Sequence, residues 1–293
     1  MPSPYAEFKS DERIVARFLD SYHKIWQANF PGLNKRAHWH VIFAARTSPS
    51  EGVSCRSIHR TLYGTYGTDI RTCIERIKDC ESDGFVRIVD PSNQPCAGSP
   101  SCLVAPTEKL RAHFDAHCAA TIAEVCAVFG GKERAGVSGS PSTIAAIYAF
   151  FGSYDRHWRE TSELVARWRG LTPAYLNDAV DHLITYQYWA IVMLLWSRSE
   201  FGCDDPPPHA LVVDEINSRM WEMLRLGHLA IRERVGNLIR WGFFAEETIK
   251  KHKAVSLTPV AGAAIAKGLA NTKPLLAELH RKLVAEHAEL VAL

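Results

Sequence analysis

One pattern of residues occurs twice in this chain, 158 positions apart. The pair Gly84-Phe85 recurs as Gly242-Phe243, and at the same offset Glu75-Arg76 falls on Glu233-Arg234. A repeat of this size indicates that one supersecondary unit is folded twice, which restricts the chain to architectures built from two related units. Apolar positions coincide as well: Ile58 with Ile216, Ile77 with Val235, and Cys80 with Leu238.

The first copy lies between Ser54 and Thr107 and begins with two helical segments. Ser54 is the predicted N-cap of a short helix, and residues 64–67 (GTYG) predict a turn after it. Thr68 is the predicted N-cap of a second helix, which Gly84 ends. The apolar residues of this second helix recur at helical spacing: Ile70, Cys73, Ile74, Ile77 and Cys80.

Two strand patterns follow the second helix of this copy. The segment FVRIV (85–89) alternates between apolar and polar residues, and CLVAP (102–106) is the predicted returning strand. Pro91 to Ser101 between them is rich in turn-forming residues. Helix, turn, helix, strand, loop and strand in this order are typical of a winged helix-turn-helix DNA-binding unit.

The second copy shows the same order of elements. VVDEINSRMW (212–221) predicts its first helix, and GHLAIRERVGNLIRWG (227–242) predicts its second. FFAEETIKKHKAVSL (243–257) predicts a hairpin with its turn near Lys250 to Lys253. We therefore predict a mainly α (α+β) fold with two winged helix-turn-helix domains, joined by a helical region with pseudo-two-fold symmetry.

Further helices and one linker complete the chain. GGKERAGVSGSPS (130–142) is rich in Gly, Ser and charge, which is typical of a linker. We divide the chain into a first winged unit at 1–130, a linker and connecting helix at 131–170, and a second winged unit at 171–293. The other helices are expected over Asp11–Ala28, Ala37–Arg46, Thr107–Phe129, Thr143–Arg169 and Pro173–Arg198.

This order of elements resembles the multiple antibiotic resistance regulator (MarR) family of winged helix-turn-helix transcriptional regulators. In the second copy VGNLIRWGFF resembles the end of that family's recognition helix, and VSLTPVAGAAI resembles its closing strand and next helix. CIERIKDCESDGFV and VAPTEKL occupy the same places in the first copy. The resemblance covers about residues 11–128 and 172–293, and the first wing lacks the family's usual arginine.

The resemblance implies a function and its partners. It implies a sequence-specific regulator whose partner is double-stranded DNA, and it permits a small aromatic effector. Members of the family are normally homodimers with one winged domain per chain. This chain would therefore be a single-chain pseudo-dimer on an imperfect palindrome, with further self-association left open.

Exposed residues near the start of the first copy's second helix are candidates for reading base edges. Arg71 is expected to contact guanine with two hydrogen bonds. Asp69 would either accept a hydrogen bond from cytosine or stabilise the helix N-terminus. Arg76 would either contact DNA or form a structural ion pair that ties the helix to its neighbour. Thr68 and Thr72 complete the candidates on this helix.

The second copy supplies a corresponding set. His228, Arg232 and Arg234 are the counterparts on its second helix, with Asn237 further along. Arg234 has the same two interpretations as Arg76, namely DNA contact or a structural ion pair.

Basic residues also mark the predicted wings. Lys250, Lys251, His252 and Lys253 lie at the tip of the second hairpin. They would form a phosphate or minor-groove clamp, or alternatively a solvated edge that discourages strand pairing. In the first wing, Arg87 is the candidate for a DNA contact.

Composition and motifs exclude other classes of protein. The formal net charge is only +2, so any basic footprint must be local. The first 13 residues lack the apolar core of a signal peptide, and the apolar run Tyr188 to Trp196 is too short to span a bilayer. We therefore expect a cytoplasmic protein that does not bind membranes. No catalytic motif with the required context occurs, so no enzyme activity is expected.

Cysteine and histidine do not predict a metal or cofactor site. The eight cysteines form no CxxC pair and no disulfide-like framework, and several occupy core positions of helices. Cys96 and Cys102 flank the first wing loop and are expected to be more exposed, without an assigned redox or metal role. No carboxylate or thiolate set completes a metal site around the histidine groups: His38 with His40, and His113 with His117 beside Cys118.

The aromatic-rich middle of the chain, residues 148–196, has two interpretations. Its side chains would pack the helices that join the winged units, or would line a pocket for an aromatic effector. The function also has an alternative. A winged-helix protein-interaction scaffold is favoured by the near-neutral charge and by the first wing without arginine.

Overall fold

A computed structural model describes residues 10–33, 35–66, 68–89, 102–129, 140–170, 186–199, 210–224 and 227–286. These residues are mainly helical with small antiparallel sheets, as predicted. The chain divides into two compact units: Tyr22–Ala149 with Lys282–Leu293, called the first unit here, and Met1–Ser21 with Phe150–Arg281, called the second unit. The domain limits at residues 130 and 170 stay predictions.

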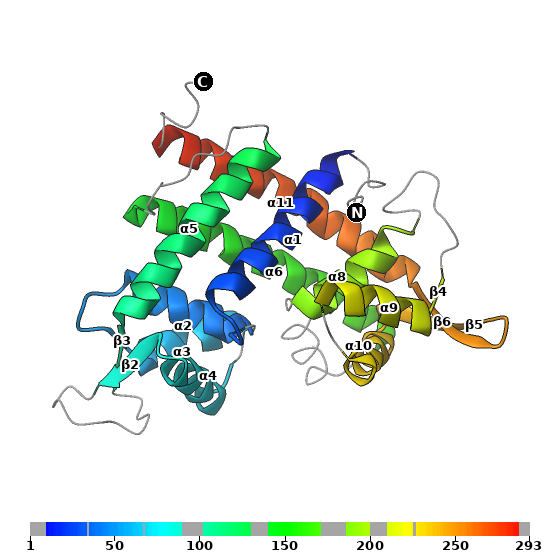
Figure 1. Cartoon of the computed structure of the whole chain (residues 1–293), viewed down its shortest axis with the longest axis horizontal. Helices are drawn as coiled ribbons and strands as arrows, with labels where there is room; N and C mark the ends of the chain where they lie inside the picture. Colours follow the sequence, from blue (N-terminus) through cyan, green and yellow to red (C-terminus); the bar gives the residue numbers. More distant parts are fainter. Residues whose placement is uncertain are drawn as a thin grey trace. The chain divides into compact units, whose positions relative to one another are not determined.

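The first unit contains a motif of two helices and three strands (Figure 1). Strand β1 (Val53–Ser54) leads into α3 (Cys55–Tyr66), which is followed by α4 (Ile70–Ser82). Strands β2 (Val86–Val89) and β3 (Leu103–Pro106) then pair antiparallel, and β1 adds to the other edge of β3. The predicted strands at 85–89 and 102–106 are confirmed.

The second unit contains the same order of elements. Strand β4 (Leu211–Val212) leads into α9 (Val213–Leu224) and α10 (His228–Arg240), followed by the hairpin β5 (Phe244–Ile249) and β6 (His252–Leu257). The sheet order β4-β6-β5 corresponds to β1-β3-β2. Each of β4, α9, α10 and β5 begins 158 residues after its counterpart, which is the offset of the sequence repeat.

Further helices accompany the two motifs, and the predicted helices are confirmed to within a few residues wherever the structure describes them. Residues 171–185, which begin the helix predicted over Pro173–Arg198, lie outside the described residues. None of the described helices combines the length and the hydropathy that a membrane crossing needs. The helices are α1 (Ser10–Asn29), α2 (Arg36–Thr47), α5 (Glu108–Val128), α6 (Pro141–Arg169), α8 (Tyr186–Trp196) and α11 (Pro259–Glu286).

The end of the second helix is built identically in both motifs. Gly84 and Gly242 have φ of +75° and +82°, a left-handed conformation that glycine adopts without the penalty of a Cβ atom. The N–H of Phe85 donates to the carbonyl of Cys80 at 2.9 Å, closing the helix with the bond typical of a Schellman cap. The N–H of Phe243 makes the equivalent 2.9 Å bond, so each glycine turns the chain from helix to strand.

In each motif a threonine after the returning strand forms a hydrogen bond to the glycine of that turn. The hydroxyl of Thr107 donates to the carbonyl of Gly84 at 2.8 Å, and the hydroxyl of Thr258 donates to Gly242 at 2.9 Å. The same hydroxyl oxygens accept from Leu110 N–H and Ala261 N–H, capping the next helix. Both bonds form although the two hairpins differ in length.

Two details of the predicted helix-turn-helix are wrong. Helix α3 continues through Gly64 to Tyr66 rather than turning at 64–67. The burial of Ile58 and Leu62 stabilises this helix, and the exposed Gly64 does not end it. The N-cap of α4 is Asp69 rather than Thr68, because the Asp69 carboxylate accepts the N–H of Thr72 at 3.0 Å.

The cysteines are mostly core residues, with one correction. The prediction of buried thiols is confirmed for Cys73, Cys80, Cys118 and Cys126. Cys102, however, is buried and disulfide-bonded, so the expectation of an exposed thiol in a chain without disulfides is wrong. Cys96 lies outside the described residues.

The core of the first unit encloses a histidine among aromatic rings. His117 on α5 is fully buried, and neither of its ring nitrogens has a hydrogen-bond partner. The rings of Tyr22, Trp26, Phe30 and Phe114 lie 5.2 to 5.9 Å from it, centroid to centroid. Burial lowers the pKa of His117 to about 3, so the ring is neutral in the folded protein.

We expect the protein to lose stability on acidification through His117. Its folded pKa lies below the unfolded value of 6.5, so the unfolded chain takes up the proton first, and stability falls as the pH drops from 6.5 towards 3. At pH 5 the loss should be about 2 kcal/mol relative to neutral pH. Urea unfolding at pH 7 and pH 5 measures it. His117→Phe should remove this part of the pH dependence, and an unchanged dependence would contradict the assignment.

Candidate nucleic-acid interface

The start of α4 presents an exposed arginine and a capped N-terminus. The Asp69 carboxylate accepts both the N–H and the hydroxyl of Thr72, and these bonds lower the pKa of Asp69. Capping is therefore the role that the geometry supports for Asp69. The Arg71 side chain is 88% exposed, and its Nε lies 3.4 Å from a carboxylate oxygen of Glu75, which is itself half exposed. Thr68 lies half-buried just before the cap.

Arg76 lies in a network that joins α4 to α2. Its side chain is only 18% exposed and pairs with Asp79 at 2.5 Å, while Nε2 of His38 on α2 lies 3.0 Å from the same carboxylate oxygen. Burial opposes ionisation of Asp79, but the hydrogen bond with His38 and the charge of Arg76 outweigh it and lower the pKa of Asp79. Burial lowers the pKa of His38, so its neutral ring donates to Asp79 from Nε2. The geometry favours the structural interpretation of Arg76.

The start of α10 differs from that of α4. Its N-cap is Gly227, which offers no side-chain bond, and His228 and Leu229 after it are exposed. Arg232 on the next turn is also exposed and lies 3.2 Å from Asp214 on α9. Leu229 was not among the predicted residues. The repeat offset was the available signal, because it places Leu229 at the position of Arg71.

Arg234 and Asn237 face α8. The Arg234 guanidinium donates to Gln187 and to the carbonyl of Ala230, and its carbon lies 5.7 Å from the ring centre of Tyr188. The amide of Asn237 donates to the Tyr188 hydroxyl at 2.7 Å. Both side chains thus tie α10 to α8, whereas in the first motif Asp79, the partner of Arg76, makes the contact between α4 and α2 through His38.

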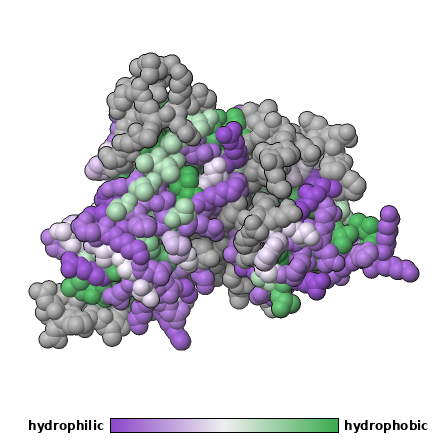
Figure 2. Space-filling view, in the orientation of Figure 1, coloured by the Kyte–Doolittle hydropathy of each residue, from purple (hydrophilic) through white to green (hydrophobic). Residues whose placement is uncertain are grey.

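The β5–β6 hairpin ends in an exposed basic turn. Ile249 pairs with His252, so Lys250 and Lys251 alone form the turn, and both have positive φ, +48° and +71°. Lys253 on β6 pairs with Glu246 at 2.5 Å, and the side chains of Lys250, Lys251 and His252 are exposed. Figure 2 shows hydrophilic side chains over this hairpin, which projects at the right of the view.

The first hairpin is described only at its base. Arg87 is exposed on β2, between the buried Val86 and Ile88. The predicted wing loop, residues 90–101, lies outside the described residues. Arg87 therefore stays a candidate contact of the first motif.

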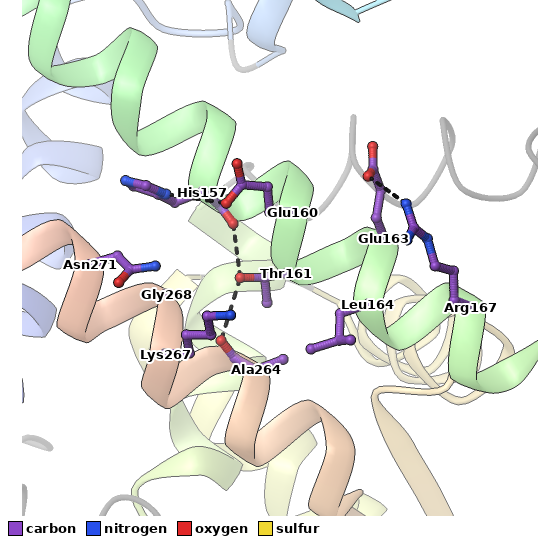
Figure 3. Close-up of a pocket in the computed structure, with 10 residues that line it drawn as sticks. All are labelled: His157, Glu160, Thr161, Glu163, Leu164, Arg167, Ala264, Lys267, Gly268 and Asn271. Atoms are coloured by element: carbon purple, nitrogen blue, oxygen red, sulfur yellow. Dashed lines mark hydrogen bonds and ion pairs between the residues drawn. The ribbon is translucent and has the colours of Figure 1, made fainter.

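The described residues of the second unit line two pockets of note. One, of about 220 Å³, lies between α6 and α11, where Thr161 bonds the carbonyl of Ala264 at 3.4 Å and Glu163 pairs with Arg167 at 3.6 Å (Figure 3). The other, of about 270 Å³, lies beside α10 and is lined by Val213, Asp214, Arg232, Val235, Gly236, Ile239 and Lys253. No Phe, Tyr or Trp is among the described lining of either pocket.

The histidines and the aromatic middle have structural roles where they are described. His40 bonds the Tyr148 hydroxyl, and His113 bonds the carbonyl of Asn29. Within the described ranges no three His, Cys, Asp or Glu side chains gather as metal ligands would. Several aromatic residues of the middle region are buried against one another, in keeping with the packing interpretation: Phe150, Phe151, Tyr154, Trp158 and Trp189.

Comparison with protein-family models gives no match to this chain, and comparison with curated proteins gives none either.

Removing Arg76 should destabilise the protein, because Asp79 would keep its charge in a partly buried position without its cation. We expect Arg76→Ala to lower the free energy of unfolding by about 1 kcal/mol, because Asp79 is 44% exposed and keeps its hydrogen bond with His38. Arg71→Ala, on the same helix but exposed, should change it by less than about 0.5 kcal/mol. Urea denaturation of both variants measures the difference, and equal effects would refute the structural role.

Proposed function

We propose that this chain is a double-stranded DNA-binding transcriptional regulator with two winged helix-turn-helix units of the MarR type in one polypeptide. Four features support the proposal: the repeated order of elements, the exposed first turns of α4 and α10, the basic β5–β6 tip, and the contacts of Asp79 (with Arg76) and Arg234 to neighbouring helices. These contacts fix each second helix against its neighbour and leave its first turn free to enter a major groove.

The observation that carries the proposal is the lysine turn of the second hairpin. A two-residue turn with positive φ at both positions normally contains Asn-Gly or Gly-Gly, because other residues are strained there. This chain has Lys250 and Lys251 instead. Residues in strained backbone conformations persist where they serve a function. Two adjacent cations on a projecting hairpin suit a phosphate backbone or a minor groove.

Two units in one chain would act as a covalent pseudo-dimer. Their second helices would enter successive major grooves about 34 Å apart, as those of a two-fold dimer do. Because the units differ at their exposed positions, the two half-sites would differ as well. A cytoplasmic location and a small aromatic effector belong to the same proposal.

A protein-interaction scaffold is the second candidate. The observation that favours it is a pair of exposed aromatic residues, Tyr63 on α3 and Trp221 on α9, which occupy equivalent positions of the two motifs. Exposed aromatics at matched positions suit a shared partner surface.

Selection from a random 40-base-pair duplex pool with the full chain, followed by binding measurements across a salt series, tests the proposal. We expect enrichment of a related pair of half-sites and an affinity that falls steeply with salt. No enrichment and no salt-sensitive binding to any duplex would overturn the regulator and leave the scaffold.

Replacing the lysine turn separates folding from binding. Lys250→Asn with Lys251→Gly should raise the free energy of unfolding by about 1 kcal/mol, since these residues fit the turn. The same change should weaken duplex binding and reduce the slope of log affinity against log salt by about 2, one for each lost phosphate contact.

The matched control is Lys267→Asn, which removes an exposed cation from α11. It should leave the salt slope unchanged. If the turn variant were more stable and bound duplex DNA with the original slope, the hairpin would have no part in binding.

A further inference from the structure

Leu229 is the most exposed of the large apolar residues that the structure describes as exposed. Its relative exposure is 83%, and the others lie between 36% and 61%. The buried stripe of α10 is formed by Ile231, Val235 and Leu238, which lie on the opposite side of the helix. The helix therefore presents Leu229 outward by its own periodicity.

Helix formation does not account for a leucine at this place. The first turn of a helix favours acidic and small polar residues, which complement its exposed N–H groups. Leu229 instead follows the exposed His228 and precedes the exposed Arg232 by one turn. An exposed apolar side chain one turn before an exposed arginine suits a partner that is a polyanion with an apolar group at that point.

The repeat assigns Leu229 its counterpart. At the offset of 158 it corresponds to Arg71, the second residue of α4, as Leu229 is the second residue of α10. Both side chains are more than four-fifths exposed. The same position thus carries a guanidinium in one motif and an isobutyl group in the other.

We propose that this position determines the difference between the two half-sites. Arg71 selects guanine, and Leu229 selects thymine by contact with its 5-methyl group. That methyl is the apolar group that the major groove offers to a side chain, whereas guanine offers the paired acceptors O6 and N7. The inference rests on the proposed DNA-binding function and deepens it.

Deoxyuridine tests the contact directly, because it lacks the methyl of thymine and keeps its hydrogen-bonding groups. Duplexes enriched by the full chain from the random pool should contain an invariant guanine in one half-site and an invariant thymine at the equivalent position of the other. Replacing that thymine with deoxyuridine should weaken binding about fourfold, the factor that corresponds to about 0.8 kcal/mol for one buried methyl or methylene group.

The variant Leu229→Ala should bind the thymine and deoxyuridine duplexes equally. Leu164→Ala supplies the matched control, because Leu164 is a 48% exposed leucine on α6, outside the motif. This control should keep the fourfold difference. The exchange Leu229→Arg should replace thymine by guanine in a new selection, and Arg71→Leu should do the reverse in the other half-site.

The outcomes separate the two levels of the proposal. If the wild-type chain binds its enriched duplex but is indifferent to deoxyuridine, or if Leu229→Ala still distinguishes the two duplexes, the thymine contact is refuted and DNA binding stands. If no duplex is enriched and none binds in a salt-sensitive way, the contact and the proposed function fail together.

Discussion

The hydrogen bond from a threonine hydroxyl to the carbonyl of a left-handed glycine holds each motif of this chain together. Through it, Thr107 and Thr258 fix the returning strand and the next helix to the end of α4 and α10. One hydroxyl serves both as donor to the turn and as acceptor for the following helix. Since this junction is independent of hairpin length, the two hairpins are free to differ without moving the helices.

The two motifs share this junction and have similar internal contacts, but their exposed residues differ. In both, a half-buried arginine belongs to the contacts between the second helix and an earlier one: Arg234 bonds Gln187 on α8 directly, and Arg76 pairs with Asp79, which bonds His38 on α2. Their exposed first turns differ in charge, in polarity and in the cap itself. In each motif the half-buried arginine follows the exposed side chain on the same helix, Arg76 after Arg71 and Arg234 after Leu229, and burial distinguishes the two positions.

Much of the fold could be predicted from the sequence, because Gly84 and Gly242 end helices and the apolar stripes define their faces. The two-residue strands β1 and β4 were not predicted, since they form only by pairing with a distant strand and leave no local periodicity. Thr68 and Asp69 are both good caps, and only coordinates decide between them. The disulfide of Cys102 was missed because spacing alone did not indicate it.

The candidate site was harder to predict than the fold. Sequence identifies cations such as Arg71 and Arg76 equally well, but their exposure depends on partners far along the chain, here His38 on another helix. Leu229 was overlooked because a search for DNA contacts selects polar residues. Its significance follows from exposure and from its place in the repeat together.

The central claim is that one chain presents two duplex-reading motifs, and hydroxyl-radical footprinting of a 1:1 complex on an enriched duplex tests it most directly. The account predicts two protected patches whose centres lie about 10–10.5 base pairs, or a multiple of that, apart. A single protected patch at 1:1 stoichiometry, or no protection, would contradict it.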